Sequence, residues 1–282
     1  LHVLANPGSG SPVGFDHSGP VAIGLPAARL YESDENEGLT EALERVAGGA
    51  TVLAASGGDG TIGAAAEVAA AKDLPLLVLP GGTLNHLARD LRVDSVADAI
   101  DAYKAGEVIE IDVGTIDGLN FINTATLGAY PRMIELRENL QGRIGRWPAH
   151  VISVLWTVSR AETMDLKING ETRSIWMVFV GNCAHEPAGF APGWRPRLDD
   201  GKLDLRVLHG ETPLARLRLI VSILAGRLTS SAAYERRLVD SIKVESGQET
   251  IPITRDGDHL EVSGSFTIGK NASCLTVFAP HD

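Results

Sequence analysis

The chain has 282 residues, of which 44% are hydrophobic and 22% charged, a composition typical of a globular protein long enough to form two domains. Its formal net charge of -11, which arises entirely in residues 1–130, argues against nucleic acid as a partner. Two cysteines are too few for a disulfide framework and indicate reduced thiols, and no apolar stretch reaches the ~18 residues of a membrane-spanning helix.

The chain begins with a predicted strand at residues 1–5, followed by the glycine turn Asn-Pro-Gly-Ser-Gly at 6–10. Asn6 either starts a turn before Pro7 or contacts a nucleotide. Residues 11–25 are rich in Gly, Pro and Ser and show no helical period. A second strand is predicted at 27–31 and a helix at 38–46, which ends near Gly48.

Residues 51–61 carry the most informative pattern. A buried strand at 52–55 leads into Ser-Gly-Gly-Asp-Gly-Thr at 56–61, and an alanine-rich helix is predicted to follow, to residue 72. Glycines allow the backbone to approach a polyphosphate, and a helix N-terminus offers free N–H donors. Asp59 would repel that anion unless a divalent cation lay between them. The alternative is a tight turn with an aspartate at a helix cap.

A second strand–turn–helix unit comes about one βαβ repeat later. An apolar run at 74–79 leads into Pro-Gly-Gly-Thr-Leu-Asn at 80–85 and a short helix. Ser95 and Gly106 then bound a predicted helix at 96–105. Strands are predicted at 108–116, which crosses into a second domain, and at 119–127.

Two predicted helices, 131–140 and 147–160, carry an excess of arginine. Such a segment lies either on an anionic membrane surface or in solvent. A hairpin is predicted at 165–173, a strand at 175–180 and an amphipathic helix at 212–228. Short strands follow, which predict a β-sandwich in the second half: 241–245, 250–255, 259–262, 265–268 and 274–279. Asp-Asp-Gly at 199–201 and Asp-Gly-Asp at 256–258 are, by themselves, ordinary turn sequences.

The three glycine turns, in this order, resemble those of the diacylglycerol kinase catalytic-domain family, which includes bacterial lipid kinases and sphingosine and ceramide kinases. The resemblance implies a three-layer α/β domain at 1–110, like that of NAD kinase and phosphofructokinase. A β-sandwich-like domain would follow at 111–282, with its last strand free to return to the first domain. It also implies ATP-dependent phosphorylation of a lipid hydroxyl, as in diacylglycerol, by a cytoplasmic protein peripheral to the membrane. The choice of lipid and the oligomeric state, including a homodimer, stay open.

The same resemblance assigns roles to individual residues. Asp59 would place Mg²⁺ at the ATP phosphates, and Asp258, where the family has Glu, would be the catalytic base. Asp200, through its carboxylate, and Arg197 and Lys202, through their carbonyls, would hold a structural Mg²⁺. ATP would contact Asn6, Ser56, Gly57, Gly58, Asp59, Gly60, Thr61, Gly82, Thr83 and Asn85.

Two alternatives remain from the same residues. An NAD kinase-like enzyme shares the glycine turn that contains Asp59. A degenerate module that binds nucleotide or lipid without catalysis would account for three departures from the family pattern: His86 where many relatives have Asp, Asp258 for Glu, and a first helix that is shortened or replaced by a loop.

Overall fold

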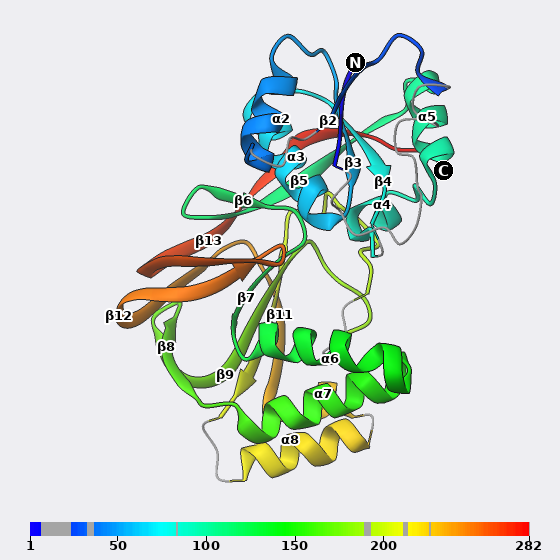
Figure 1. The fold of residues 1–282 in the computed structure, drawn as a ribbon. Helices are drawn as coiled ribbons and strands as arrows, with labels where there is room; N and C mark the ends of the chain where they lie inside the picture. Colours follow the sequence, from blue (N-terminus) through cyan, green and yellow to red (C-terminus); the bar gives the residue numbers. More distant parts are fainter. Residues whose placement is uncertain are drawn as a thin grey trace.

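The computed structural model describes residues 1–6, 24–32, 37–82, 84–188, 193–210, 214–225 and 227–281. The rest of the first glycine turn, at 7–10, and Thr83 therefore lie outside the described residues. Figure 1 shows two lobes, with both chain ends in the upper one.

The first lobe is a parallel sheet in the order β4-β3-β1-β2, with helices on both of its sides (Figure 1). Its elements are β1 His2–Ala5, β2 Arg29–Glu32, α2 Leu39–Ala47, β3 Leu53–Gly57, α3 Asp59–Ala71, β4 Leu76–Pro80, α4 His86–Asp90 and α5 Val96–Ala105. Both central strands, β3 and β4, are buried along their whole length. Continuous apolar runs are what a parallel sheet covered on both faces requires.

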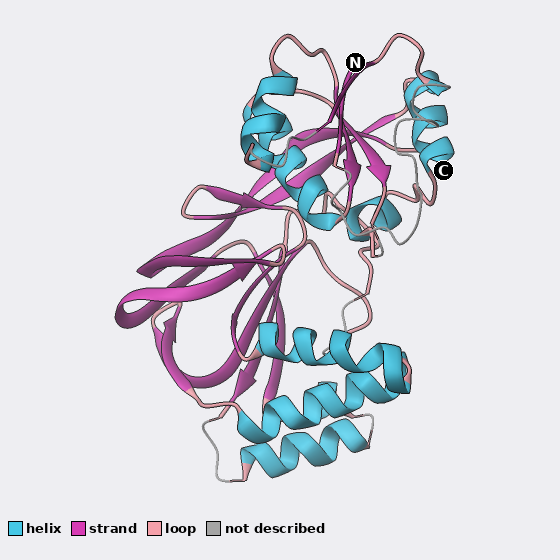
Figure 2. Cartoon of the chain, viewed as in Figure 1, coloured by secondary structure: helices cyan, strands magenta, loops and turns pink. Residues whose placement is uncertain are grey.

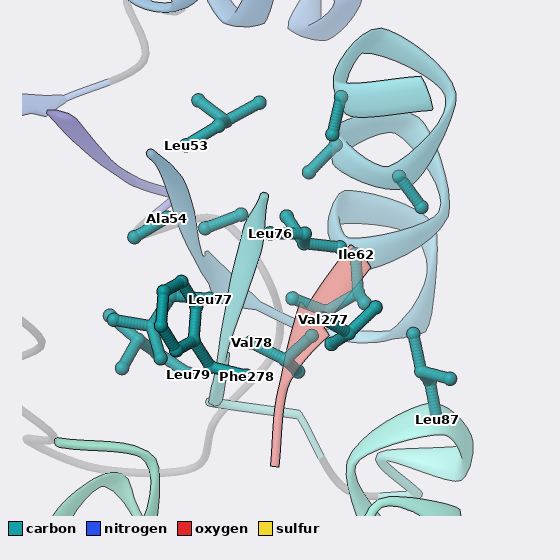
Figure 3. Packing of buried hydrophobic residues seen from close by; sticks show 14 of the residues in the cluster. Leu53, Ala54, Ile62, Leu76, Leu77, Val78, Leu79, Leu87, Val277 and Phe278 are labelled. Atoms are coloured by element: carbon teal, nitrogen blue, oxygen red, sulfur yellow. The ribbon is translucent and has the colours of Figure 1, made fainter. Parts of the chain in front are cut away.

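Small residues allow α3 to pack closely on this sheet. Ala65, Ala66 and Ala69 are fully buried in the same cluster as Leu53, Leu76 and the other strand side chains. Figure 3 shows Ile62 of α3 and Leu87 of α4 near the strands. Helix α5 is bounded locally, because Ser95 and Asp98 form a capping box and Gly106 ends the helix at φ 71°.

The second lobe is antiparallel. Its elements are β5 Val108–Ile116, β6 Leu119–Phe121, β7 Thr124–Gly128, α6 Tyr130–Ile144, α7 Arg146–Arg160, β8 Met164–Ile168, β9 Glu171–Asn182, β10 Leu203–His209, α8 Ala215–Leu224, a 3-10 turn Leu228–Ser230, β11 Tyr234–Val239, β12 Ile242–Arg255 and β13 Asp258–Phe278. A second hydrophobic core lies among these strands, and a third lies under the helices.

The sheet is continuous between the lobes. Its strands are hydrogen-bonded in the order β11-β10-β9-β7-β12-β13-β4-β3-β1-β2, with β5, β6 and β8 attached at the sides. The link is β13, which pairs with β12 and β5 along most of its length and then with β4 through Val277 and Leu76. The β-rich second half is therefore as expected, but its strands belong to one hydrogen-bonded series with the first lobe.

Helices α6, α7 and α8 lie together in the second lobe, with α6 on the side of the first lobe and α8 farthest from it (Figures 1 and 2). They cover a core that includes Met133, Val154, Trp176 and Leu219. Among the described residues, no helix has the length and apolar character needed to cross a membrane.

Candidate functional site

Two glycine turns of the first lobe pack directly against each other. A Cβ at Gly82 would lie 2.6 Å from the Cα of Gly58, and one at Gly57 would lie 2.6 Å from the side chain of Thr61. The N–H of Gly81 donates to the carbonyl of Gly57 at 3.0 Å, and Gly82 and Asn85 exchange two hydrogen bonds. Glycine is thus required at both turns by close approach of the chains.

Asp59 stands at the start of α3, on the side of these turns that faces the second lobe. Its Oδ1 accepts a hydrogen bond from the backbone N–H of His86 at 2.6 Å, which ties α3 to the first residue of α4. Burial lowers the pKa of His86, with Asp59 and Asp90 opposing that effect, so its imidazole is neutral at pH 7. Asp59 is half-buried, and its Oδ2 has no hydrogen-bond partner among the residues that the structure describes.

In the second lobe, the residues that face Asp59 are held in place by Asp256, which lies in the turn between β12 and β13. Its carboxylate accepts three backbone N–H groups, from Ile122, Asn123 and Thr124, at 2.6, 2.7 and 2.8 Å. Burial raises the pKa of Asp256, and these three donors oppose the rise. The backbone between β6 and β7 is therefore held in place by one side chain more than 130 residues away.

Arg195 links the first lobe to the second through its guanidinium group. Its guanidinium Nε donates to Asp90 Oδ2 at 2.6 Å, in an ion pair whose two side chains are 1% and 5% exposed. The other guanidinium nitrogens donate to the carbonyl of Ile122 at 2.6 Å and to Asn123 Oδ1 at 3.0 Å. α4 of the first lobe and the β6–β7 segment of the second are thus fixed to the same cation.

A cavity of about 390 Å³ lies between the lobes. Its polar lining includes Asp59, His86, Asp90, Asn123, Thr124, Thr126, Glu135, His185, Asp256 and His259, and its apolar and aromatic lining includes Leu84, Tyr130, Phe179 and Trp194. Burial raises the pKa of Tyr130 to about 12, so this phenol stays protonated.

Only some of the expected nucleotide residues reach this cavity. Asp59 lines it, whereas Ser56 and Thr61 are buried, and Asn6 donates from Nδ2 to Thr61 Oγ1 at 3.0 Å. Ser56 also accepts, through its carbonyl, the N–H of Asn6 at 3.0 Å. Asn6, Ser56 and Thr61 therefore support the turns by hydrogen bonds to one another and do not line the cavity. Asn85 likewise holds its own turn, from a left-handed backbone at φ 48°.

Asp258 is not brought to the cavity. It is exposed, it pairs with Arg255 across the hairpin, and the next pair along, Thr254 and His259, lines the cavity. Neighbouring residues of a strand point to opposite faces, so the Asp258 carboxylate projects from the face opposite that of His259. The carboxylate that the turn does present to the cavity is that of Asp256.

Two of the three expected structural magnesium ligands, the Asp200 carboxylate and the Lys202 carbonyl, are found at an amine. Lys270 Nζ lies 3.1 Å from Asp200 Oδ1 and 2.6 Å from the carbonyl of Lys202. The side chain of Arg197 is exposed and pairs with Asp199. These residues do not fit a magnesium ion here, because a cationic side chain already occupies the place between them.

Sequence reasoning missed Arg195 and Asp90, which no local pattern marks, and found Asp256 only as the first residue of the Asp-Gly-Asp turn, without its role. Each works through partners that are distant in the chain: Arg195 and Asp90 are 105 residues apart. His86 was noticed only as a departure from a family pattern, although it follows a glycine turn directly.

Comparison with known proteins shows which family these turns are similar to. Residues 1–116 match the family model described as the diacylglycerol kinase catalytic domain. Over these residues, which are less than half of the chain, the sequence is similar to that domain family. The resemblance drawn from the three glycine turns is therefore confirmed.

Relatives of the diacylglycerol kinase family extend over both lobes. A probable lipid kinase YegS-like of Pseudomonas aeruginosa is 28% identical over 228 residues, which are 77% of this chain and 73% of that protein. A diacylglycerol kinase of Staphylococcus saprophyticus is 26% identical over 298 residues, 99% of this chain and 95% of its own. The crystal structure of a putative diacylglycerol kinase from Bacillus anthracis covers 99% of this chain and 97% of its own, with a TM-score of 0.72 and 22% identity, and so shares the fold.

The buried His185 beside Arg195 leads to a prediction about acid stability. Burial, with the Arg195 charge as second cause, lowers the pKa of His185 to about 3, and its Nδ1 lies 2.9 Å from the carbonyl of Cys183. An unfolded histidine takes up a proton below about pH 6.5, whereas the native one does not. The free energy of unfolding therefore falls as the pH falls from about 6.5 towards 3, by up to about 1.4 kcal/mol per pH unit from this residue.

Melting temperatures measured between about pH 7 and 5 check this, because the carboxylates titrate mainly lower. His185→Gln should lose stability less steeply over this range than the wild type. His281→Gln, a change at an exposed imidazole, should keep the wild-type slope. Equal slopes in all three proteins would contradict the assignment.

Proposed function

We propose that this protein is an ATP-dependent lipid kinase that transfers the γ-phosphoryl group to a lipid hydroxyl. The observation that carries the proposal is the position of Asp59, at the N-terminus of α3 and in the wall of a cavity lined by both lobes. One lobe offers backbone N–H groups for a polyphosphate, and the other offers a partly apolar wall for a second substrate.

A magnesium ion fits at Asp59. The ion commonly binds proteins through one or two carboxylates and takes its remaining ligands from phosphate oxygens and water. Asp59 Oδ2 is uncommitted among the described residues, and its Oδ1 is oriented by the N–H of His86. When bound, the ion would neutralise the charge on the transferring group, while the turns at Gly57, Gly58 and Gly82 let the phosphates approach the backbone.

The lipid would enter from the second lobe. Tyr130, Phe179 and Trp194 supply apolar surface to the cavity, and the neutral phenol of Tyr130 can donate a hydrogen bond to a headgroup oxygen. Two cavity carboxylates are committed, since Asp90 pairs with Arg195 and Asp256 holds three backbone N–H groups. Glu135 of α6 also lines the cavity but is exposed, so Asp59 is the half-buried cavity carboxylate left to organise the transfer. In such a transfer, positioning and charge stabilisation matter more than covalent chemistry.

A direct test is incubation of the protein with Mg²⁺ and radiolabelled ATP, against fractionated lipid extracts that include diacylglycerol. Label in a lipid fraction supports the proposal and identifies the substrate class. Nucleotide binding without transfer to any lipid would instead favour a non-catalytic module. In a parallel incubation with added NAD, label in the dinucleotide would favour an NAD kinase-like enzyme.

The outer helices of the second lobe are proposed to hold the protein at a membrane surface. On α8, Leu217, Val221 and Leu224 are 53%, 56% and 64% exposed, at a spacing that puts them on one face of the helix. On α7, Ile152 and Trp156 are 45% and 41% exposed, and Arg160 stacks 4.8 Å from the Trp156 ring. Apolar side chains beside arginines suit the interface of an anionic bilayer.

This proposal predicts salt-sensitive binding to vesicles. Sedimentation with phosphatidylglycerol vesicles should weaken as salt is added and should exceed sedimentation with phosphatidylcholine vesicles. Leu217→Gln with Val221→Gln should reduce binding about tenfold or more, since each removes apolar area worth over 1 kcal/mol. Leu238→Gln, at an exposed residue of β11, is the matched control. Unchanged vesicle binding in the α8 variant would show that these residues form an ordinary solvent-exposed face and do not contact the membrane.

A further inference from the structure

Four segments from different parts of the chain meet at a buried ammonium group. Lys270 Nζ, on β13, lies 2.9 Å from Asp112 Oδ2 of β5 and 3.1 Å from Asp200 Oδ1. It also lies 2.6 Å from the carbonyl of Lys202 and 3.1 Å from Cys183 Sγ, just after β9. The side chains of Lys270 and Asp112 are only 4% and 1% exposed. This Lys270 cluster is outside the cavity lining described above.

The hydrogen bonds of the ammonium are complete. Its three N–H groups have three oxygen acceptors, on Asp112, Asp200 and Lys202, and the Cys183 sulfur is a weaker fourth neighbour. Burial raises the pKa of Cys183 to about 11, so the thiol is neutral and leaves the negative charge to the two aspartates.

The two carboxylates are held in position independently of the lysine. Asp112 accepts backbone N–H groups from Gly201 and Ser273, both at 2.8 Å. Asp200 accepts those of Ala184 and Lys202, also both at 2.8 Å. Four backbone donors from three segments thus aim two carboxylates and one carbonyl at a single point.

That point has the ligand chemistry of a hard cation. Carboxylate and carbonyl oxygens are the preferred ligands of Mg²⁺ and Ca²⁺, and carboxylate oxygens of Asp112 and Asp200 and the Cys183 sulfur lie within 4.8 Å of one another. Magnesium, however, needs near-octahedral oxygen at about 2.0–2.1 Å. The oxygens here are at hydrogen-bonding distance from Lys270 Nζ, and a second cation beside the ammonium would be repelled.

We infer that the ammonium of Lys270 is the resident cation of this junction and stands in place of a structural divalent metal. Lys270 pairs with Gly114 of β5, one residue before β13 shifts its register against β5 between Asn271 and Leu275. One covalently attached charge therefore ties β5, β13 and the 199–202 turn together, without any bound ion.

The first test uses the unmodified protein without nucleotide. Nucleotide is left out because its phosphates could hold a metal ion at Asp59, and that ion would be confused with one at the Lys270 cluster. The melting temperature should be the same, within about 1 °C, in excess chelator and in millimolar Mg²⁺ or Ca²⁺. Metal analysis of protein dialysed against Mg²⁺ should find no tightly held ion. A chelator-induced fall of several degrees, with one metal per chain, would overturn the inference.

The second test removes the amine. Lys270→Ala leaves two buried carboxylates without a cation, which is expected to lower the melting temperature in chelator by on the order of 6–10 °C. The vacated space should then accept a divalent ion, so that Mg²⁺ or Ca²⁺ restores part of the loss in a concentration-dependent way. Lys243→Ala, which breaks an exposed ion pair with Glu245, is the matched control and should show neither effect.

A double variant, Lys270→Ala with Asp200→Asn, separates a metal at this junction from one elsewhere. Removal of the Asp200 charge should abolish the rescue by metal seen in the single variant. Rescue that persists in the double variant, or a Lys270→Ala protein as stable as the wild type in chelator, would refute the assignment. If Lys270→Ala does not fold, the metal content and chelator response of the unmodified protein decide the question.

Discussion

Asp59→Asn is expected to lower the rate of lipid phosphorylation on the order of a thousandfold while the melting temperature stays within about 2 °C of the wild type. Asparagine has the same shape as aspartate, and its Oδ1 can still accept the N–H of His86, which wild-type Asp59 binds at 2.6 Å. What it loses is the negative charge that would hold Mg²⁺ at the phosphates. Turnover measured with saturating Mg²⁺ and ATP separates this loss from weaker nucleotide binding.

The matched control for this variant is Asp101→Asn, the same exchange at an exposed residue of α5 in the same lobe. It should leave both turnover and melting temperature unchanged. Near-wild-type turnover in Asp59→Asn would remove the metal role of Asp59, and with it the observation on which the kinase proposal chiefly rests.

The second large effect is expected at Asp256. Asp256→Ala leaves the N–H groups of Ile122, Asn123 and Thr124 without their acceptor. Each unsatisfied donor costs about 1–3 kcal/mol, and water can replace part of this, because Asp256 is partly exposed. We expect a fall in melting temperature of roughly 5–10 °C. A shift of about 1 Å in this wall would cost on the order of a hundredfold in phosphorylation rate.

Asp258→Ala, two residues further on, is both the control and a test of the catalytic base expected from the family resemblance. Because the Asp258 side chain is exposed on the face opposite His259, the variant should keep activity within about twofold and an unchanged melting temperature. A folded but inactive Asp258→Ala protein would show that the resemblance was the better guide, and that the hairpin turns this carboxylate into the cavity during catalysis.

Local signals predicted the first lobe well. Helix α5 has the predicted ends, at 96–105, because a capping box and Gly106 determine those ends within a few residues. The second half was predicted as several short strands, whereas β12 and β13 run for 14 and 21 residues. Their exposed polar residues, such as Glu249, suggested turns, but pairing between the two strands continues on both sides of the bulge.

The residues of the candidate site and of the Lys270 cluster also fall into two groups, those that a local sequence pattern marks and those that it does not. Asp59 was predicted because its signal, glycines around a carboxylate between a strand and a helix, is contained in six residues. Lys270 and Arg195 could not be found, since each is meaningful only beside partners 68 to 158 positions away, among them Asp112 and Asp90. A buried lysine in an alternating strand looks the same in sequence as an exposed one.

The path of β13 has a consequence for how the chain is made. Leu275, Val277 and Phe278 belong to the same core as Leu53 and Leu76, and Val277 pairs with Leu76 of β4 (Figure 3). A ribosome releases the first lobe's other strands long before these residues emerge. Until then, the edge of β4 that later pairs with β13 has no strand beside it. Unpaired strand edges are sites of misfolding and aggregation in incomplete chains. Completion of the first lobe therefore waits until residues 275–278 have been synthesised.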